Sequence, residues 1–243
     1  MRETRLVDYL GFLQDLWLTG ADYFLEEGQA VNFWAEYFSS RESNEVLRPF
    51  APFTSKDCDI WASHTALLYL RENRNGGRLI TGTSPADGQV GIFRIADNPE
   101  YVVDIMSNVY GIPMHQLDNV KARCLLLEGV RVIDPLFLFQ SKCHCLLGLD
   151  QTGRQDERHV RMLSLIVPAH FEALLAEVIA GHLTERALIR ELKFMQKILK
   201  QNQIKRALEQ IKVRPTSFVP IDSLTTSNLS KVVQFAETGL RAG

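Results

Sequence analysis

Cysteine, glycine and proline are all scarce in this chain of 243 residues, and neither sign of charge is in clear excess. Four cysteines are too few for the disulfide framework of a secreted protein, so we expect free thiols in a reducing compartment. Fifteen glycines and nine prolines exclude a collagen-like or low-complexity chain. The 27 basic and 29 acidic residues give a net charge of −2, which excludes a protein that binds nucleic acid or anionic lipid through its overall charge.

Long hydrophobic runs are also missing from the sequence. No run approaches the roughly 18 apolar residues that a membrane-spanning helix needs. The first apolar stretch, 6–18, is interrupted by Asp8 and Asp15 and has the period of an amphipathic helix, not the pattern of a signal peptide. We therefore expect a cytoplasmic protein that makes no contact with a membrane.

Short strand-like segments alternate with helical ones in the first half of the chain, whereas the second half is helical throughout. Several connections are as short as hairpins, which indicates a mixed sheet. We therefore predict an α+β fold, with a mixed β-sheet core and flanking helices in a domain of residues 1–134, followed by a helical domain of residues 135–243. The predicted strands are 23–25, 57–62, 78–82, 90–95 and 101–106, with a hairpin at 123–133, a loop at 41–44 and a turn at 84–88.

A glycine stands where the first predicted strand gives way to a helix. Gly28 follows the apolar run 23–25 and precedes a helical pattern that includes Ala30, Val31 and Trp34. The first N–H groups of a helix have no partner within the helix, so a helix start can bind an anion. Gly28 is therefore a candidate anion-binding position.

Three aspartates on neighbouring predicted strands are the strongest chemical signal in the sequence. Asp57 and Asp59 are two residues apart, so on a strand their side chains point to the same face. Asp104 lies within the otherwise apolar segment 101–106, where a lone buried carboxylate would be costly. Three carboxylates together would hold one or two Mg²⁺ ions. Asp-x-Asp also arises by chance, and Asp104 alone is compatible with a structural acid at a strand end.

The order of these features resembles the nucleotidyltransferase superfamily with a polymerase-β-like core. The chain looks most like the minimal bacterial branch of this superfamily that includes the abortive-infection toxins. The resemblance spans about residues 20 to 165, and the order of the motifs is more specific than any one of them. The matching segments are 24–30 (strand and glycine turn), 54–60 (Thr-x-x-Asp-hydrophobic-Asp pattern), 102–111 (third carboxylate), 133–142 (Pro to Lys) and 155–159 (basic-Asp helix).

This resemblance implies a Mg²⁺-dependent enzyme that transfers a nucleoside monophosphate from a nucleoside triphosphate to a hydroxyl group on protein, RNA or a small molecule. It also implies roles for individual residues. Asp57 and Asp59 would ligate both metal ions, and Asp104 would ligate the catalytic one and help to deprotonate the acceptor. The phosphates would be bound by the backbone amides of Gly28 and Gln29, with Ser55 and Lys142 assisting. For Lys142, a solvated lysine on a helix is an equally compatible interpretation.

Two departures from the family pattern keep other interpretations open. Glu27 replaces the first glycine of the turn and places a carboxylate beside the expected triphosphate, and the spacing from Gly28 to Asp57 is longer than usual. One alternative is a catalytically degenerate nucleotidyltransferase fold that acts as a binding or interaction module. Another is an unrelated α+β fold that matches by chance.

A basic segment follows in the helical half. Residues 185–214 contain nine basic and three acidic residues. Five of the basic residues recur at helical steps of three and four, which places them on one face. A solvated helix face and a surface that contacts RNA or another polyanion are both compatible with this pattern. The five are Arg186, Arg190, Lys193, Lys197 and Lys200.

Overall fold

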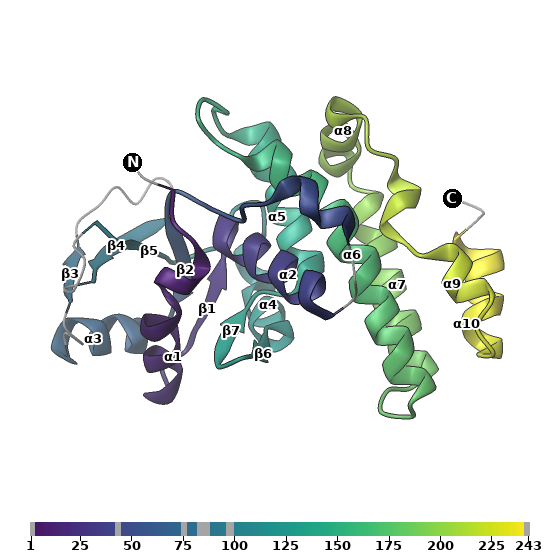
Figure 1. The fold of residues 1–243 in the computed structure, drawn as a ribbon, viewed down its shortest axis with the longest axis horizontal. Helices are drawn as coiled ribbons and strands as arrows, with labels where there is room; N and C mark the ends of the chain where they lie inside the picture. The colour runs from purple at the N-terminus through teal and green to yellow at the C-terminus, as the bar shows by residue number, and fades with distance from the viewer. Residues whose placement is uncertain (1–2, 42–44, 74–76, 82–87, 96–99, 241–243) are drawn as a thin grey trace.

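A single mixed sheet and a group of long helices lie side by side, with one helix of the N-terminal half between them (Figure 1). The computed structural model describes residues 3–41, 45–73, 77–81, 88–95 and 100–240. The strands are β1 (Tyr23–Glu26), β2 (Cys58–Ala62), β3 (Arg78–Thr81), β4 (Gln89–Arg94), β5 (Val102–Met106), β6 (Leu125–Leu127) and β7 (Val130–Val132). The helices are α1 (Leu10–Leu18), α2 (Glu27–Arg41), α3 (His64–Asn73), α4 (Leu117–Arg123), α5 (Pro135–Gly148), α6 (Asp156–Ile179), α7 (Glu185–Leu199), α8 (Asn202–Ile211), α9 (Ile221–Thr225) and α10 (Ser230–Phe235).

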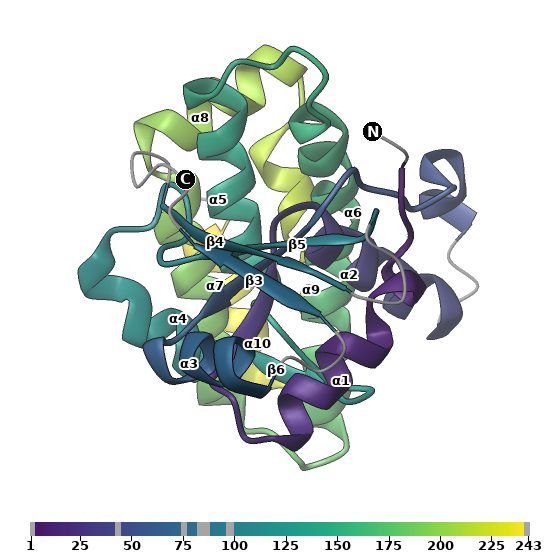
Figure 2. The ribbon, with the colours of Figure 1, turned by 90° about the vertical axis from the view of Figure 1, so that its left-hand side faces the viewer.

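The described strands form one seven-stranded sheet in the order β3-β4-β5-β2-β1-β7-β6. β2 pairs with β1 in antiparallel orientation and with β5 in parallel orientation, and β1 pairs in parallel with β7. The view turned by 90° shows the strands in front of α2, α5 and α6 (Figure 2). This arrangement confirms the predicted α+β fold with a mixed sheet and flanking helices.

Helix α2 joins the sheet to the helical half. It starts directly after β1, because Glu27 adopts a positive φ of 55° that turns the chain from strand into helix. Trp34 in its middle is buried, and its Nε1 donates to the Ile133 carbonyl oxygen at 2.9 Å. The Trp34 ring also meets His170 of α6 edge to face, with ring centroids 6.2 Å apart. Aromatic side chains of this size provide much of the buried apolar area in a core.

Most predicted elements are present with bounds shifted by a few residues, and α2 begins at Glu27, next to the predicted strand-to-helix junction at Gly28. The predicted loop at 41–44 and turn at 84–88 lie largely outside the described residues. The division into domains at residue 134 stays a prediction. The contacts of α2 with both α5 and α6 place the two halves against each other.

Helix α6 differs from the expectation that no segment of the chain is long and apolar enough to cross a membrane. By length and composition alone, its 24 residues are long and apolar enough to cross a membrane, the one such helix among the described residues. Half of its most apolar window is buried inside the protein. The helix packs against α2, α5 and α7, as the central helix of a folded core does.

Asp134 connects the sheet half with the helical half at the start of α5. Its Oδ1 accepts hydrogen bonds from the backbone N–H groups of Leu136 (2.8 Å) and Phe137 (3.2 Å), so it caps the helix. Its Oδ2 accepts from Arg123 of α4 at 2.8 Å, and Arg123 also donates to Glu191 of α7 at 2.6 Å. One buried carboxylate therefore links α4, α5 and, through Arg123, α7.

Replacing Asp134 with alanine removes the helix cap and one partner of Arg123. We expect the free energy of unfolding to fall by about 2 kcal/mol, which combines a lost cap with a lost charged hydrogen bond. Asp134→Asn keeps an acceptor for the cap and should lose about half as much. Urea unfolding of both variants measures the difference, and equal stability of the alanine variant and the wild type would contradict this role.

Candidate functional site

The three predicted aspartates meet at one end of the central strands. Asp59 on β2 lies beside Asp104 on β5 in parallel register, and Asp57 immediately precedes β2. One carboxylate oxygen from each of the three lies within 4.8 Å of the others. Adjacent parallel strands bring residues at the same register to the same face, so the pairing of β2 with β5 explains the convergence.

The electrostatics of this carboxylate triad favour a bound cation. Burial raises the pKa of Asp59 well above its usual range, and repulsion from Asp57, Glu27 and Asp104 raises it further. A cation between the oxygens would offset both costs. The donor set consists of hard carboxylate oxygens, which suits Mg²⁺, so the residues present fit the ion that the resemblance implies.

A cavity of about 590 Å³ lies over the triad. Its volume is in the range of small-molecule sites. The strand ends form its floor, and the starts of α2 and α6 and the second half of α5 form its walls. Its residues are Glu26, Glu27, Gly28, Ser55, Lys56, Asp57, Asp59, Gln89, Asp104, Met106, Asn108, Tyr110, Lys142, Cys145, Leu149, Gly153, Arg154, Gln155, Asp156 and His159.

Gly28 lies at the closest approach of α2 to the triad. A Cβ atom on Gly28 would lie 2.5 Å from Ser55 Oγ and 3.2 Å from His159 Cε1, so a larger residue would displace one of them. Ser55 Oγ donates to Asp57 Oδ1 at 3.4 Å. Gln29, the other residue predicted here, is fully buried, and its side-chain amide donates to the Thr4 carbonyl oxygen at 3.2 Å. It is not among the residues that line the cavity.

Lys142 reaches the cavity from α5 and is buried, so the interpretation as a solvated lysine is wrong. Its Nζ donates to Glu27 Oε2 and, at 3.0 Å, to Asp156 Oδ1. Burial by itself would lower the pKa of Lys142, but the adjacent Glu27 and Asp156 carboxylates outweigh it and hold the pKa above its usual range. Lys142 is therefore charged and held between two acids.

Arg154, which is partly exposed, adds a second cation to this set of charges. Its Nε donates to Asp156 Oδ2 at 2.5 Å, and its guanidinium lies 3.8 Å from Glu27 Oε2. Burial would raise the pKa of Asp156, yet Lys142 and Arg154 lower it to about 2. We call Glu27, Lys142, Arg154 and Asp156 the Glu27 cluster. It contains two cations and two carboxylates, so its formal charge is zero.

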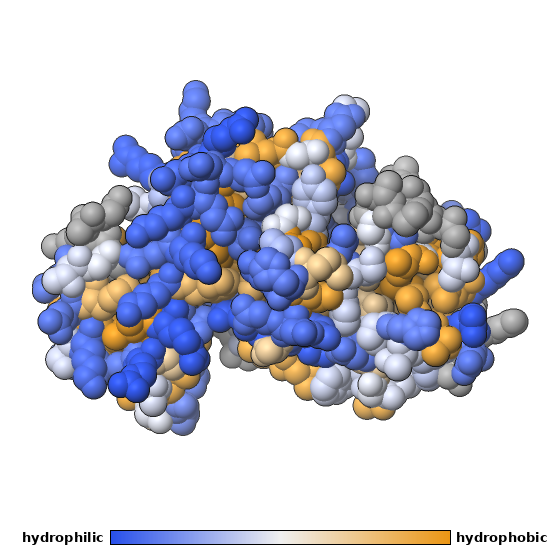
Figure 3. Space-filling view, turned by 180° about the vertical axis from the view of Figure 1, so that it is seen from behind, coloured by the Kyte–Doolittle hydropathy of each residue, from blue (hydrophilic) through white to orange (hydrophobic). Residues whose placement is uncertain are grey.

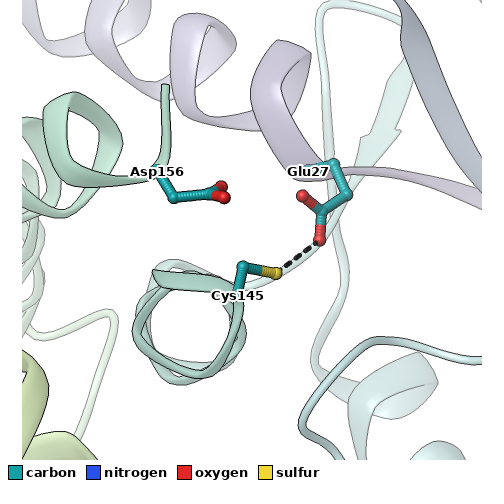
Figure 4. A group of neighbouring side chains, drawn as sticks. All are labelled: Glu27, Cys145 and Asp156. Carbon is teal, nitrogen blue, oxygen red and sulfur yellow. Dashed lines mark hydrogen bonds between the residues drawn. The ribbon is translucent and has the colours of Figure 1, made fainter. Parts of the chain in front are cut away.

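Glu27 and Asp156 also form a group with Cys145 whose ligand atoms lie within 4.8 Å of one another. Figure 4 shows their side chains converging from the starts of α2 and α6 and from α5, with the Cys145 thiol donating to Glu27 Oε1 at 3.4 Å. Lys142 Nζ already supplies the positive charge between the two carboxylates. This group therefore fits an internal ion pair better than a second metal site.

Two buried side chains on the cavity wall were missed by the sequence analysis as site residues. Glu26 and His159 are 1% and 3% exposed, and neither the carboxylate oxygens of Glu26 nor the ring nitrogens of His159 have a hydrogen-bond partner among the described residues. Burial raises the pKa of Glu26 and lowers that of His159, so both favour the neutral form. Glu26 lies opposite Asp59 in the β1–β2 register.

Four basic residues of α7 and Lys200, which directly follows it, form an exposed row on the helical half. We call Arg186, Arg190, Lys193, Lys197 and Lys200 the α7 stripe. Glu191, on the same helix, instead turns toward Arg123. Figure 3, which views the protein from behind, shows hydrophilic residues over most of the half formed by the C-terminal helices. A contact of the α7 stripe with RNA or another polyanion stays a prediction.

Comparison with known proteins shows a limited likeness of fold. No protein-family model matches the chain, and no curated protein sequence matches it. Among solved structures, the chain is similar to an antigenic nucleotidyltransferase-like protein from Paracoccidioides brasiliensis, at 11% sequence identity and a TM-score of 0.42. The likeness covers 68% of this chain and 79% of that chain. A likeness of this extent concerns the fold alone.

Proposed function

We propose that the protein is a Mg²⁺-dependent nucleotidyltransferase that moves a nucleoside monophosphate from a nucleoside triphosphate to a hydroxyl group. The observation that carries the proposal is the carboxylate triad, whose oxygens lie within 4.8 Å of one another on adjacent strands at the floor of a cavity of about 590 Å³. Mg²⁺ bound there would activate the attacking hydroxyl and stabilise an in-line phosphoryl displacement.

The three aspartates of the triad would have different roles in this reaction. Asp57 and Asp59 would hold both ions, and Asp104, on the neighbouring strand, would hold the catalytic ion and help to deprotonate the acceptor hydroxyl. The new bond joins the acceptor oxygen to the α-phosphorus, and the bond from that phosphorus to the bridging oxygen breaks, so pyrophosphate leaves. Gly28, Ser55 and Lys142 line the same cavity and would contact the phosphates that depart.

In its widest form, the proposal includes three classes of acceptor: protein, RNA and small molecules. The α7 stripe favours a polyanion such as RNA, since exposed cations at regular helical spacing contact phosphate groups without reading sequence. Membership of the branch with abortive-infection toxins is a further part of the proposal and rests on the resemblance of the sequence. A cytoplasmic location is also proposed, and it rests on the few cysteines and the sequence pattern of the N-terminal segment.

A second candidate function is supported by Glu27. Its carboxylate pairs with Lys142 and lies close to Arg154, the cations that would otherwise face a triphosphate. A protein with these cations permanently occupied would be a degenerate transferase fold that serves as a binding or interaction module. The triad favours the enzyme, because a pure binding module needs no convergence of three carboxylates.

Thermal melting with each of ATP, GTP, CTP and UTP, with and without Mg²⁺, separates the two functions. A ligand present at 100 times its dissociation constant stabilises a protein by about 2.7 kcal/mol, or about 5–10 °C for a chain of this size. If the protein is the proposed enzyme, we expect its melting temperature to rise by this amount with at least one nucleotide, and only in the presence of Mg²⁺. Unchanged melting with all four nucleotides would favour the binding module.

A further inference from the structure

Glu27 is held in an unusual backbone conformation by its side-chain contacts. Its φ of 55° lies in the left-handed region, which disfavours residues with a Cβ atom. Lys142 donates to one carboxylate oxygen, and Ser141 Oγ and Cys145 Sγ contact the other at 3.5 Å and 3.4 Å. A residue in such a conformation persists only when its surroundings fix it, and here the fixing contacts are those to its carboxylate.

The Glu27 carboxylate lies beside two cations of the cavity wall. Lys142 and Arg154 are the cations of the cavity wall that pair with Glu27, and both also pair with Asp156. Asp156 pairs with both cations independently of Glu27, so the cluster without the Glu27 carboxylate would have a formal charge of +1 and would attract a further anion.

His159 independently indicates that a polar ligand belongs at the same place. Its imidazole is 3% exposed, both ring nitrogens are unpartnered among the described residues, and the ring lines the cavity. The Cε1 atom between the two nitrogens faces Gly28, at 3.2 Å from where a Cβ atom would be. A buried polar side chain without a partner is costly, so this ring is suited to a hydrogen bond with a bound ligand.

We propose that Glu27 is an internal competitor for a phosphate subsite formed by Lys142, Arg154 and His159, and that a polyphosphate binds by displacing the Glu27 carboxylate. The inference rests on the proposed function for the identity of the anion, a polyphosphate of a nucleotide. Glu27 is then a specificity-determining residue: an anion enters only if it binds the two cations better than the carboxylate already present.

Neutralising Glu27 should therefore increase anion binding. In the Glu27→Gln variant the cluster changes from a formal charge of zero to +1, while Asp156 still pairs with both cations. The probe is inorganic tripolyphosphate, titrated by calorimetry at low salt, without divalent cations. We expect its dissociation constant to fall at least tenfold, which corresponds to about 1.4 kcal/mol, and the gain to shrink as salt is raised.

Two further variants of the site make the experiment specific. Glu27→Gly removes the carboxylate and also suits the positive φ, so it should show the same gain even if the glutamine variant folds poorly. Adding His159→Leu to Glu27→Gln should weaken tripolyphosphate binding at least threefold. The matched control is Glu157→Gln, which removes an exposed carboxylate on the first turn of α6, paired with Arg161; it should bind tripolyphosphate as the wild type does.

The proposal would be overturned if both Glu27 variants bound tripolyphosphate no better than the wild type. It would also be overturned if the Glu157→Gln control gained affinity, or if adding His159→Leu to Glu27→Gln had no effect. These results do not depend on metal binding by the carboxylate triad, because no divalent cation is present and the triad is the same in all the variants compared. The proposed function fails separately, if no nucleoside triphosphate with Mg²⁺ stabilises the wild type or the Glu27 variants.

Discussion

The Lys142→Met variant should lose about 3–5 kcal/mol of unfolding free energy, the cost of breaking a buried ion pair from one side. Its melting temperature should fall by about 10 °C. Methionine fills a similar volume, so the loss comes from charge. Glu27 and Asp156 would both remain, with Arg154 alone to pair with them. Urea unfolding and thermal melting both measure the effect.

A second substitution tests this explanation. Adding Glu27→Gln to Lys142→Met removes one of the two uncompensated carboxylates and should recover at least half of the lost stability. Lys197→Met, on the exposed α7 stripe, is the control for the same chemical change and should alter stability by no more than about 0.5 kcal/mol. Similar stability of Lys142→Met and Lys197→Met would show that the buried pairs do not support the fold.

In the Asp57→Asn/Asp59→Asn variant, transfer activity should fall at least about 10³-fold, because ions that supply several kcal/mol of transition-state stabilisation lose two of their three ligands. The stabilisation by nucleotide with Mg²⁺ should disappear in the same variant. Asp118→Asn removes an exposed carboxylate on α4, paired with Lys121, and is the control. Activity retained in the double variant would exclude the proposed mechanism.

Without metal, the single variant Asp59→Asn should be more stable than the wild type at neutral pH. The pKa of Asp59 is higher in the folded than in the unfolded protein, because of burial and of the nearby Asp57, Glu27, Asp104 and Glu26 carboxylates. The folded state therefore binds the proton more tightly, and stability is lost as the pH rises through the folded-state pKa.

The difference in melting temperature between Asp59→Asn and the wild type isolates this effect. It should be small near pH 4 and should grow as the pH rises. The comparison is needed because the lowered pKa of His159 and of His170 acts in the opposite sense on the whole protein, removing stability as the pH falls below about 6.5. Mg²⁺ should reverse the sign of the difference. A pH-independent difference would contradict the assigned cause.

The mixed sheet and the convergence of the aspartates were predictable because both follow from local patterns. A period of two places Asp57 and Asp59 on one face, and an aspartate in an apolar strand needs a partner. Register between strands then completes the triad. The positive φ of Glu27 was not predictable, because an apolar period gives no signal for a glutamate that turns the chain in this way.

The Glu27 cluster was beyond the reach of sequence patterns. Lys142 and Glu27 are 115 residues apart, and they meet only because α5 packs against α2. Either residue alone has the pattern of an exposed charge. Glu26 and His159 carry no signal for the same reason: their burial depends on elements that close over the strand ends only in the folded protein.

The carboxylates at the floor of the cavity come from the first half of the chain, whereas the two cations of the Glu27 cluster come later, which sets an order for assembly of the site during synthesis. Glu26, Glu27, Asp57, Asp59 and Asp104 are all made before Lys142 and Arg154. A nascent chain that ends near residue 134 therefore exposes an acidic floor without its two cationic partners. Domains tend to fold from the N-terminus as they emerge from the ribosome. The Glu27 cluster reaches its formal charge of zero only after the first turn of α6 has left the ribosome.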